Sequence, residues 1–198
     1  GKNVIVIGGG DTGTDCVATS LRHGCESLVQ FEIMGEPSKN RSANNPWPEW
    51  PKVLKVDYGQ KEFIELFGRD PREYLTTVTK VNADKDGNVE SVDTVKVEWK
   101  KDENGRFAPI PVEGSEKNYK ADLILLAMGF TGSEDYLKNA FAVESDARSN
   151  VQTQDGSYKT NVPKIFTTGD ARSGQSLVVR AIADGIAAGE AVDKFLRS

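Results

Sequence analysis

The sequence holds few of the residues that ligate metals or form disulfide bridges: two cysteines, Cys16 and Cys25, and one histidine, His23. The nine-residue spacing of the cysteines matches no metal motif, and two thiols are too few for an iron–sulfur or zinc site of their own. We expect both to be reduced, half-buried thiols. His23 lies near a predicted helix end with no paired carboxylate or nucleophile in a recognisable motif, so we expect a capping or surface residue.

Long apolar runs and a strong charge of one sign are also missing. No stretch approaches the roughly 20 apolar residues of a membrane helix, and residues 1–8 lack the layout of a signal peptide. The net charge of −5, from 30 acidic and 25 basic residues, would not attract nucleic acid or an anionic membrane. We therefore expect a cytoplasmic protein with neither partner. Its 198 residues can bury a core as one domain or two small ones.

What is present begins with a strand–helix–strand unit. Residues 3–7 are a continuous β-branched run, typical of a strand buried on both faces of a parallel sheet. Residues 11–24 have helical spacing that ends at a glycine, and residues 27–33 predict a second strand. This order predicts an α/β fold with a Rossmann-like nucleotide-binding domain.

The middle and end of the chain predict a loop, a meander and a long closing helix. Residues 34–57 hold four of the eight prolines and two of the three tryptophans, so we expect an ordered loop there. Trp47 and Trp50 either pack this loop onto the domain, or form a lid or a partner contact. The other predicted elements are a helix at 60–68, antiparallel strands at 73–83, 91–100 and 106–112 with turns at 84–88 and 101–105, a strand at 121–130, a hairpin at 155–156, a strand at 164–170 and a helix at 176–196.

The turn between the first strand and the first helix carries the clearest chemical signal. Gly8, Gly10 and Gly13 have the spacing G-x-G-x-x-G, directly after a strand and at the start of a helix. In a dinucleotide site the first glycine allows the tight turn, the second allows a pyrophosphate to approach, and the third lets the helix pack closely on the strand. The free amides around Asp11 and Thr12 would then face the phosphates. The alternative is a glycine turn that only joins a strand to a helix.

The end of the second strand bears on which dinucleotide would bind. Glu32 follows Gly13 by 19 residues, where an acid commonly accepts hydrogen bonds from a ribose 2′-hydroxyl, as in NAD sites. Arg41 and Lys39 in the following loop could instead reach the 2′-phosphate of NADP. The preference therefore stays open. The alternative for Glu32 itself is a solvated strand-end acid.

Four stretches together carry a resemblance to a known family: GGGDTGTDC at 8–16, NNPWPEWP at 44–51, ADLILLAMGF at 121–130 and TTGDARSGQSLVVRAIADG at 167–185. They resemble the small (β) subunit of glutamate synthase, or the C-terminal region of the single-chain NADH-dependent enzyme, among the two-dinucleotide-binding flavoproteins. The resemblance covers nearly the whole chain. It implies that residues 1–125 form an NAD(P)-binding domain and that residues 126–198 are the returning C-terminal part of an FAD-binding domain.

The resemblance also implies where a flavin would lie. Asp170 would bind its ribityl or phosphate region, and Gln175, Ser176 and Leu177 would lie against the isoalloxazine edge. The remaining candidate cofactor-binding residues are Gly129, near the end of the 121–130 strand, and Gly169, before Asp170. No catalytic residue is assigned, because hydride transfer between two bound cofactors needs orientation more than acid–base groups.

The reaction implied by the resemblance is hydride transfer from NAD(P)H to FAD. Electrons then pass through iron–sulfur clusters to a large subunit, where glutamine-derived ammonia and 2-oxoglutarate become glutamate. The family's FAD fingerprint and cysteine-rich segment would precede residue 1, so we expect a C-terminal fragment that binds NAD(P)H, binds FAD weakly or not at all, and lacks full activity. The apolar face of its last helix would pack on the NAD(P) domain or drive self-association.

Two other functions remain open at this point. One is a related NAD(P)H-dependent flavoprotein reductase with a different electron acceptor. The other is a non-enzymatic nucleotide-binding module.

Overall fold

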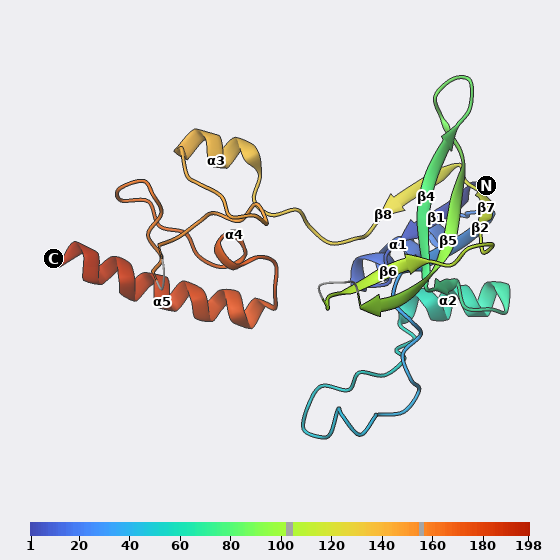
Figure 1. The fold of residues 1–198 in the computed structure, drawn as a ribbon, viewed down its shortest axis with the longest axis horizontal. Coiled ribbons are helices and arrows are strands. Elements are labelled where there is room, and N and C mark those ends of the chain that lie inside the picture. Colours follow the sequence, from blue (N-terminus) through green and yellow to red (C-terminus); the bar gives the residue numbers. More distant parts are fainter. Residues whose placement is uncertain (102–104, 155–156) are drawn as a thin grey trace. The chain divides into compact units, whose positions relative to one another are not determined.

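In the computed structural model, which describes residues 1–101, 105–154 and 157–198, a parallel sheet lies at the centre of the first of two units, Gly1–Met128 (Figure 1). Its four strands, in the order β3-β2-β1-β8, are β1 (Asn3–Ile7), β2 (Ser27–Glu32), β3 (Arg72–Tyr74) and β8 (Leu123–Leu126). All pair in parallel, and β1 is central, with Val4 opposite both Leu28 and Leu123.

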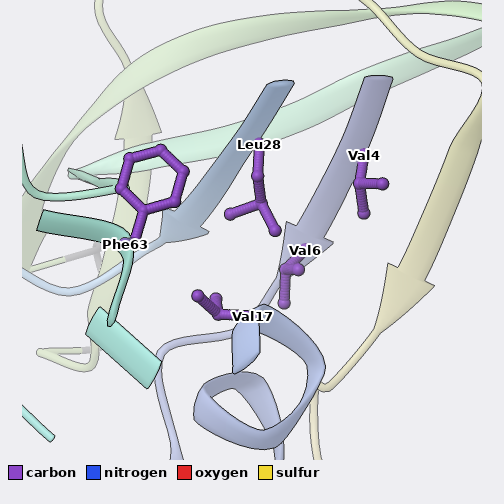
Figure 2. Close-up of a cluster of buried hydrophobic side chains, with 5 residues drawn as sticks. All are labelled: Val4, Val6, Val17, Leu28 and Phe63. Atoms are coloured by element: carbon purple, nitrogen blue, oxygen red, sulfur yellow. The ribbon is translucent and has the colours of Figure 1, made fainter. Parts of the chain in front are cut away.

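Helices α1 (Asp11–Arg22) and α2 (Tyr58–Phe67) pack against one face of this sheet. The side chains that form the core on this face are Val4, Val6, Val17, Leu28 and Phe63 (Figure 2). They come from both central strands and both helices, and each is at most 3% exposed. Burial of this apolar area is the main term that holds the helices to the sheet.

An antiparallel sheet contributes to the core on the other face of the parallel sheet. It consists of β4 (Thr76–Ala83), β5 (Val89–Lys101), β6 (Phe107–Pro111) and β7 (Lys117–Lys120), with β5 paired to the other three. Ile5 and Phe31 of the parallel sheet are buried together with Val92 and Ala121. Because both faces of β1 are buried, its side chains are apolar at successive positions and do not alternate. The predicted α/β fold with an antiparallel meander is confirmed.

The strand predicted at 73–83 is divided into β3 and β4. Leu75 lies between them with φ of 52°, and this left-handed residue turns the chain from the parallel sheet into the antiparallel one. Strand β7 was not predicted. The turn at 84–88 is present, with Asp84 Oδ1 accepting hydrogen bonds from the amides of Asp86 (2.8 Å) and Asn88 (2.9 Å). The turn predicted at 101–105 falls mostly on residues 102–104, outside the described residues.

The loop that follows β2 is held together by its own polar groups, and it extends away from the two sheets in Figure 1. Asn45, 1% exposed, donates to Glu49 Oε2 and to the carbonyl of Trp50, both at 3.0 Å, and accepts from the amide of Lys52 at 2.8 Å. The side chains of Trp47 and Trp50 are nevertheless 83% and 81% exposed. The alternative in which they pack the loop onto the domain is therefore wrong.

The second unit, Gly129–Ser198, contains helices α3 (Asp135–Phe141), α4 (Asp170–Ser173) and α5 (Val178–Leu196). The strand predicted at 164–170 is wrong: this segment makes one isolated bridge, Lys159 with Phe166. A strand needs a neighbour for its amides and carbonyls, and the described residues of this unit provide no strand to pair with it. Helix α3 was not predicted, and the hairpin at 155–156 lies outside the described residues.

Asp184 of α5 joins the segment around Gly169 to that helix. Its carboxylate accepts hydrogen bonds from the amide of Gly169 (2.6 Å), from Thr168 Oγ1 (3.0 Å) and from Tyr158 Oη (3.2 Å). It also forms an ion pair with Arg172, whose Nε lies 3.1 Å from Oδ2. These bonds, first of all those from Arg172, hold the pKa of the Asp184 carboxyl well below its usual range.

Much of the apolar surface of α5 is exposed. The side chains that are 57% to 73% exposed at its start and along its first half are Leu177, Val178, Val179, Ile182 and Ile186. Packing of this face on the first unit and self-association both stay predictions. No helix in the described part of the chain combines the length and apolar character that crossing a membrane requires.

Candidate functional site

The glycine turn joins β1 to α1, and Gly8 is the residue that makes it tight. Its φ is +123°, a conformation that residues with a side chain rarely adopt. A Cβ at this position would also lie 2.1 Å from the carbonyl oxygen of Ala127, after β8. The amide of Gly8 donates to the carbonyl of Phe31 at 2.9 Å. Only glycine fits at this point, where the chain passes between two neighbouring strand ends.

Gly13 brings α1 close to the sheet. A Cβ at Gly13 would lie 2.2 Å from the carbonyl oxygen of Gly8 and 2.6 Å from Nε2 of Gln30. Neither contact is compatible with a methyl group, so the first turn of α1 is pressed against the glycine turn. This is the close helix–strand approach expected for the third glycine of the motif.

Gly10 differs from the other two because the space around it is open. It is the N-cap residue of α1, with φ of −79°, and no described atom outside its own neighbours lies within 4 Å of a Cβ at this position. Asp11 and Thr12, the first two residues of the helix, are exposed, and no described side chain caps this helix end. An uncapped helix N-terminus presents unpaired amides and partial positive charge, which suits a phosphate group.

Glu32, the last residue of β2, lies against the glycine turn. Its Oε1 accepts a hydrogen bond from the amide of Met34 at 2.8 Å, and its Oε2 would be 1.8 Å from a Cβ at Gly9. A pocket opens beside this carboxylate at the carboxyl ends of β2 and β3. The pocket is lined by Gly9, Glu32, Met34, Gly35, Pro37, Val53, Lys55, Arg72 and Tyr74.

Arg41 and Lys39 are not among the residues that line this pocket. Arg41 belongs to the hydrogen-bonded part of the loop, where its Nη1 donates to the carbonyls of Asn45 at 3.0 Å and Glu49 at 2.9 Å. Lys39 is exposed on the same loop. The structure therefore brings Glu32 to the glycine turn but does not bring Arg41 to it.

The side-chain amide of Gln30, which was not predicted as part of the site, is buried and hydrogen-bonded to the glycine turn. Gln30 of β2 is 0% exposed, and its Nε2 donates to the carbonyl of Gly8 at 2.8 Å. Its Oε1 accepts from Nε2 of Gln60 at 3.0 Å, and the Gln60 amide also pairs with Thr14 Oγ1. The signal in the sequence that could have revealed this network is a glutamine within a strand that is otherwise apolar and buried.

Replacing Gln30 by leucine should lower the free energy of unfolding by about 2 kcal/mol, because it leaves the Gly8 carbonyl and the Gln60 amide buried without this partner. Urea unfolding followed by circular dichroism measures the loss. Glu65→Gln, an exposed change on α2, is the control and should alter stability by less than about 0.5 kcal/mol. Equal stability of the Gln30→Leu variant and the parent chain would show that the network does not hold the turn.

The residues assigned to a flavin lie in the second unit. Gly129 has φ of 90°, and Gly169, with φ of 62°, is the N-cap residue of α4, followed by the exposed Asp170. Gln175 and Ser176 are exposed just before α5, and Leu177 is the N-cap residue of that helix. No described side chain caps α5, and its first turn, all of it described, holds no acidic residue.

Both thiols lie among the described residues, where they and the acidic side chains form no metal centre. Cys16 and Cys25 are free and half-buried, and burial is the main cause that raises the pKa of both thiols. Within the described ranges, no group of three or more histidine, cysteine, aspartate or glutamate side chains is placed to hold a metal ion.

Comparison with known proteins identifies related sequences along nearly the whole chain. Glutamate synthase [NADH] of Saccharomyces cerevisiae is 46% identical over 197 residues, 99% of this chain and 9% of that protein. Glutamate synthase [NADPH] small chain of Bacillus subtilis is 43% identical over 196 residues, 99% of this chain and 40% of that protein. The resemblance to glutamate synthase is confirmed. The chain spans less than half the length of these relatives.

The fold is shared with FprA from Mycobacterium tuberculosis, solved in complex with NADPH, with a TM-score of 0.63 at 17% identity. The match covers all of this chain and 52% of FprA. The sequence profile described as "Pyridine nucleotide-disulphide oxidoreductase" matches residues 1–185. With its glycine turn at the strand–helix junction and this match over most of its length, the chain belongs to the pyridine nucleotide-disulphide oxidoreductase family.

Proposed function

We propose that this chain serves the NAD(P)H-oxidising half of a glutamate synthase and that its first unit binds the nucleotide. The observation that carries the proposal is the open, uncapped start of α1 at Gly10. On either side of it, Gly8 and Gly13 lie where close backbone contacts leave no room for a side chain. The amides at Asp11 and Thr12 would bind the pyrophosphate. The Glu32 carboxylate, beside Gly9, would accept hydrogen bonds from the adenosine ribose.

The two halves of the chain would hold different cofactors. We assign residues 1–125 to an NAD(P)-binding domain and residues 126–198 to the C-terminal part of an FAD-binding domain. The division of the structure into the units 1–128 and 129–198 supports this assignment. The fold shared with FprA, a protein solved with NADPH, supports it as well.

The second unit offers groups of the right chemistry for a flavin. The uncapped start of α5, at Leu177, would place partial positive charge where a reduced flavin carries negative charge, because the first turn has no acid to cancel it. Asp170 would bind the ribityl or phosphate region, with Gly129 and Gly169 allowing close approach of the backbone. When bound, the flavin would take hydride from the nicotinamide and supply electrons for glutamate synthesis.

The name of the Bacillus subtilis relative, a small chain, supports a large-chain partner for this protein too. We propose that electrons leave the flavin through iron–sulfur clusters toward that partner, where glutamine and 2-oxoglutarate are converted to glutamate. The described residues contribute orientation and electrostatics to this process. The chain without the other parts of such an enzyme would bind nucleotide but would not complete the reaction.

Isothermal titration calorimetry with NADH, NADPH and ADP-ribose tests the nucleotide site. We expect saturable binding at one site for at least one of the two dinucleotides. ADP-ribose should compete for this site, because the proposed contacts are made to the pyrophosphate and the ribose. AMP, which lacks the pyrophosphate, should bind more weakly. If no pyridine nucleotide binds to the folded chain, the proposed function is wrong.

A further inference from the structure

We infer that the pocket beside the glycine turn selects NADH over NADPH, because both cations in its lining are already paired with carboxylates of this chain. The inference rests on the proposed function, which places the adenosine ribose at Glu32. NADPH carries a phosphate on the 2′-oxygen of that ribose, with a charge of about −1.5 to −2 near neutral pH. A pocket that accepts it needs at least one positive side chain free to approach.

Glu32 gives the pocket a negative charge at the point where the 2′-oxygen would lie. Its hydrogen bond from the Met34 amide fixes the carboxylate beside Gly9. Its register partner on β3 is Tyr74, which also lines the pocket. Burial is the main cause that raises the pKa of Tyr74; the Arg72 guanidinium opposes the rise, and nearby carboxylates, Glu32 among them, add to it. The Glu32 carboxylate, held at this point, therefore disfavours a second anion there.

Arg72, the first of the two cations, is occupied and cannot easily turn. Its Nε and Nη2 form a two-bond contact with Asp70 at 2.9 and 2.7 Å, and its Nη1 donates to the carbonyl of Lys55 at 2.9 Å. The side chain is only 8% exposed, and its guanidinium lies over the ring of Tyr74. Moving it to a phosphate would break this two-bond contact and leave the Asp70 carboxylate without its partner, which opposes the move.

Lys55, the second cation, is held by Asp57 at 2.7 Å. The hydrogen bond to Asp57 is the main cause that raises the pKa of the Lys55 ammonium. This pair is more exposed than the first, so its carboxylate neutralises Lys55 but does not lock it. Arg41 is bound to carbonyls of its own loop and does not line the pocket. Among the described lining residues, neither cation is left without a carboxylate partner.

Asp57 offers a variant that changes charge with little change in structure. Its side chain accepts a hydrogen bond from the amide of Tyr58 and caps α2. Asparagine caps helices as well as aspartate does, so Asp57→Asn should keep the helix while it frees Lys55. Glu32→Gln is the complementary variant, because it removes the negative charge and keeps an acceptor.

Calorimetric titration of the full chain with NADH and NADPH, at the same low ionic strength, tests the inference. The parent chain should bind NADH at least about tenfold more tightly, as expected from one unscreened carboxylate facing the phosphate. Asp57→Asn should tighten NADPH about threefold to tenfold and leave NADH unchanged. Glu32→Gln should weaken NADH, tighten NADPH and bring the two affinities to within a few-fold. Circular dichroism checks that each variant is folded.

The outcomes separate this inference from the proposed function. If NADPH binds as tightly as NADH, or more tightly, the selectivity is wrong while the nucleotide site stands. If Asp57→Asn is folded and leaves the NADPH affinity unchanged, neutralisation of Lys55 is not a cause of the selectivity. If neither dinucleotide binds, the proposed function fails, and the inference fails with it.

Discussion

Replacement of Gly13 by alanine is expected to lower the free energy of unfolding by about 3 kcal/mol. The added methyl group would lie 2.2 Å from the backbone carbonyl of Gly8, so helix α1 must move away from the sheet or the turn must deform. Either response disturbs the core around Val17, which packs from α1 onto β1 and β2. Urea unfolding, with circular dichroism as the signal, measures the loss.

Gly10→Ala is the matched control for this change, and the two variants separate stability from binding. At Gly10 the φ of −79° suits any residue, and no described atom outside its own neighbours lies within 4 Å of the new methyl group. The free energy of unfolding should therefore fall by less than about 1 kcal/mol. Nucleotide affinity should fall by about tenfold or more, because the methyl group occupies the space left for the pyrophosphate. Full nucleotide affinity in Gly10→Ala, or unchanged stability in Gly13→Ala, would contradict this account.

The second large effect is expected at Asp184, in the other unit. Asp184→Ala removes the acceptor for the Gly169 amide and the partner of Arg172, which leaves several polar groups unpaired in a side-chain cluster that is mostly shielded from water. We expect this unit to lose about 3 kcal/mol of stability. Hydrogen–deuterium exchange of the amides at 157–198 in the full chain measures it without interference from the first unit.

Asp193→Ala supplies the control for Asp184. This acid lies on the same helix and pairs with Arg197, but it is exposed, so its removal should cost less than about 1 kcal/mol. Similar exchange rates in both variants would show that Asp184 is no more than another surface acid.

The same carboxylate predicts how the stability of this unit depends on pH. Because the pKa of Asp184 is lowered in the folded unit, the unfolded chain binds the proton more readily. The stabilisation is complete above the ordinary carboxyl pKa of about 4 and is lost progressively as the pH falls below it toward the folded pKa. Protection of the amides at 157–198, measured as exchange relative to the intrinsic rate at each pH, should therefore fall between about pH 4 and pH 2 in the parent chain, and less so in Asp184→Ala.

The sequence was most informative where a signal is local. The run at 3–7, the glycine spacing at 8–13 and the stop at Gly24 each reflect a conformational requirement of a few neighbouring residues, and the strand, turn and helix lie where these signals predict them. The closeness of Glu32 to the turn was also expected, because the ends of neighbouring parallel strands meet at one edge of a sheet.

Features set by distant parts of the chain were missed. Leu75 has a positive φ, yet no glycine, asparagine or proline marks the break between β3 and β4. The segment at 164–170 has the composition of a strand but no partner strand among the described residues of its unit. Asp184 stands within an apolar helical pattern, where nothing in the local sequence indicates that it bonds to residues 12 to 26 positions earlier.

The antiparallel sheet lies between β3 and β8 in the sequence, and this order matters while the chain is being synthesised. Strand β1 pairs with β8 only after the whole intervening region has left the ribosome, since Val4 lies opposite Leu123. At about 5–20 residues per second, this leaves one edge of β1 unpaired for several seconds during translation. We therefore expect the nascent chain to need protection of that apolar edge. A nascent chain arrested before residue 123 should remain bound to chaperones, whereas a chain arrested well after β8 should be released from them.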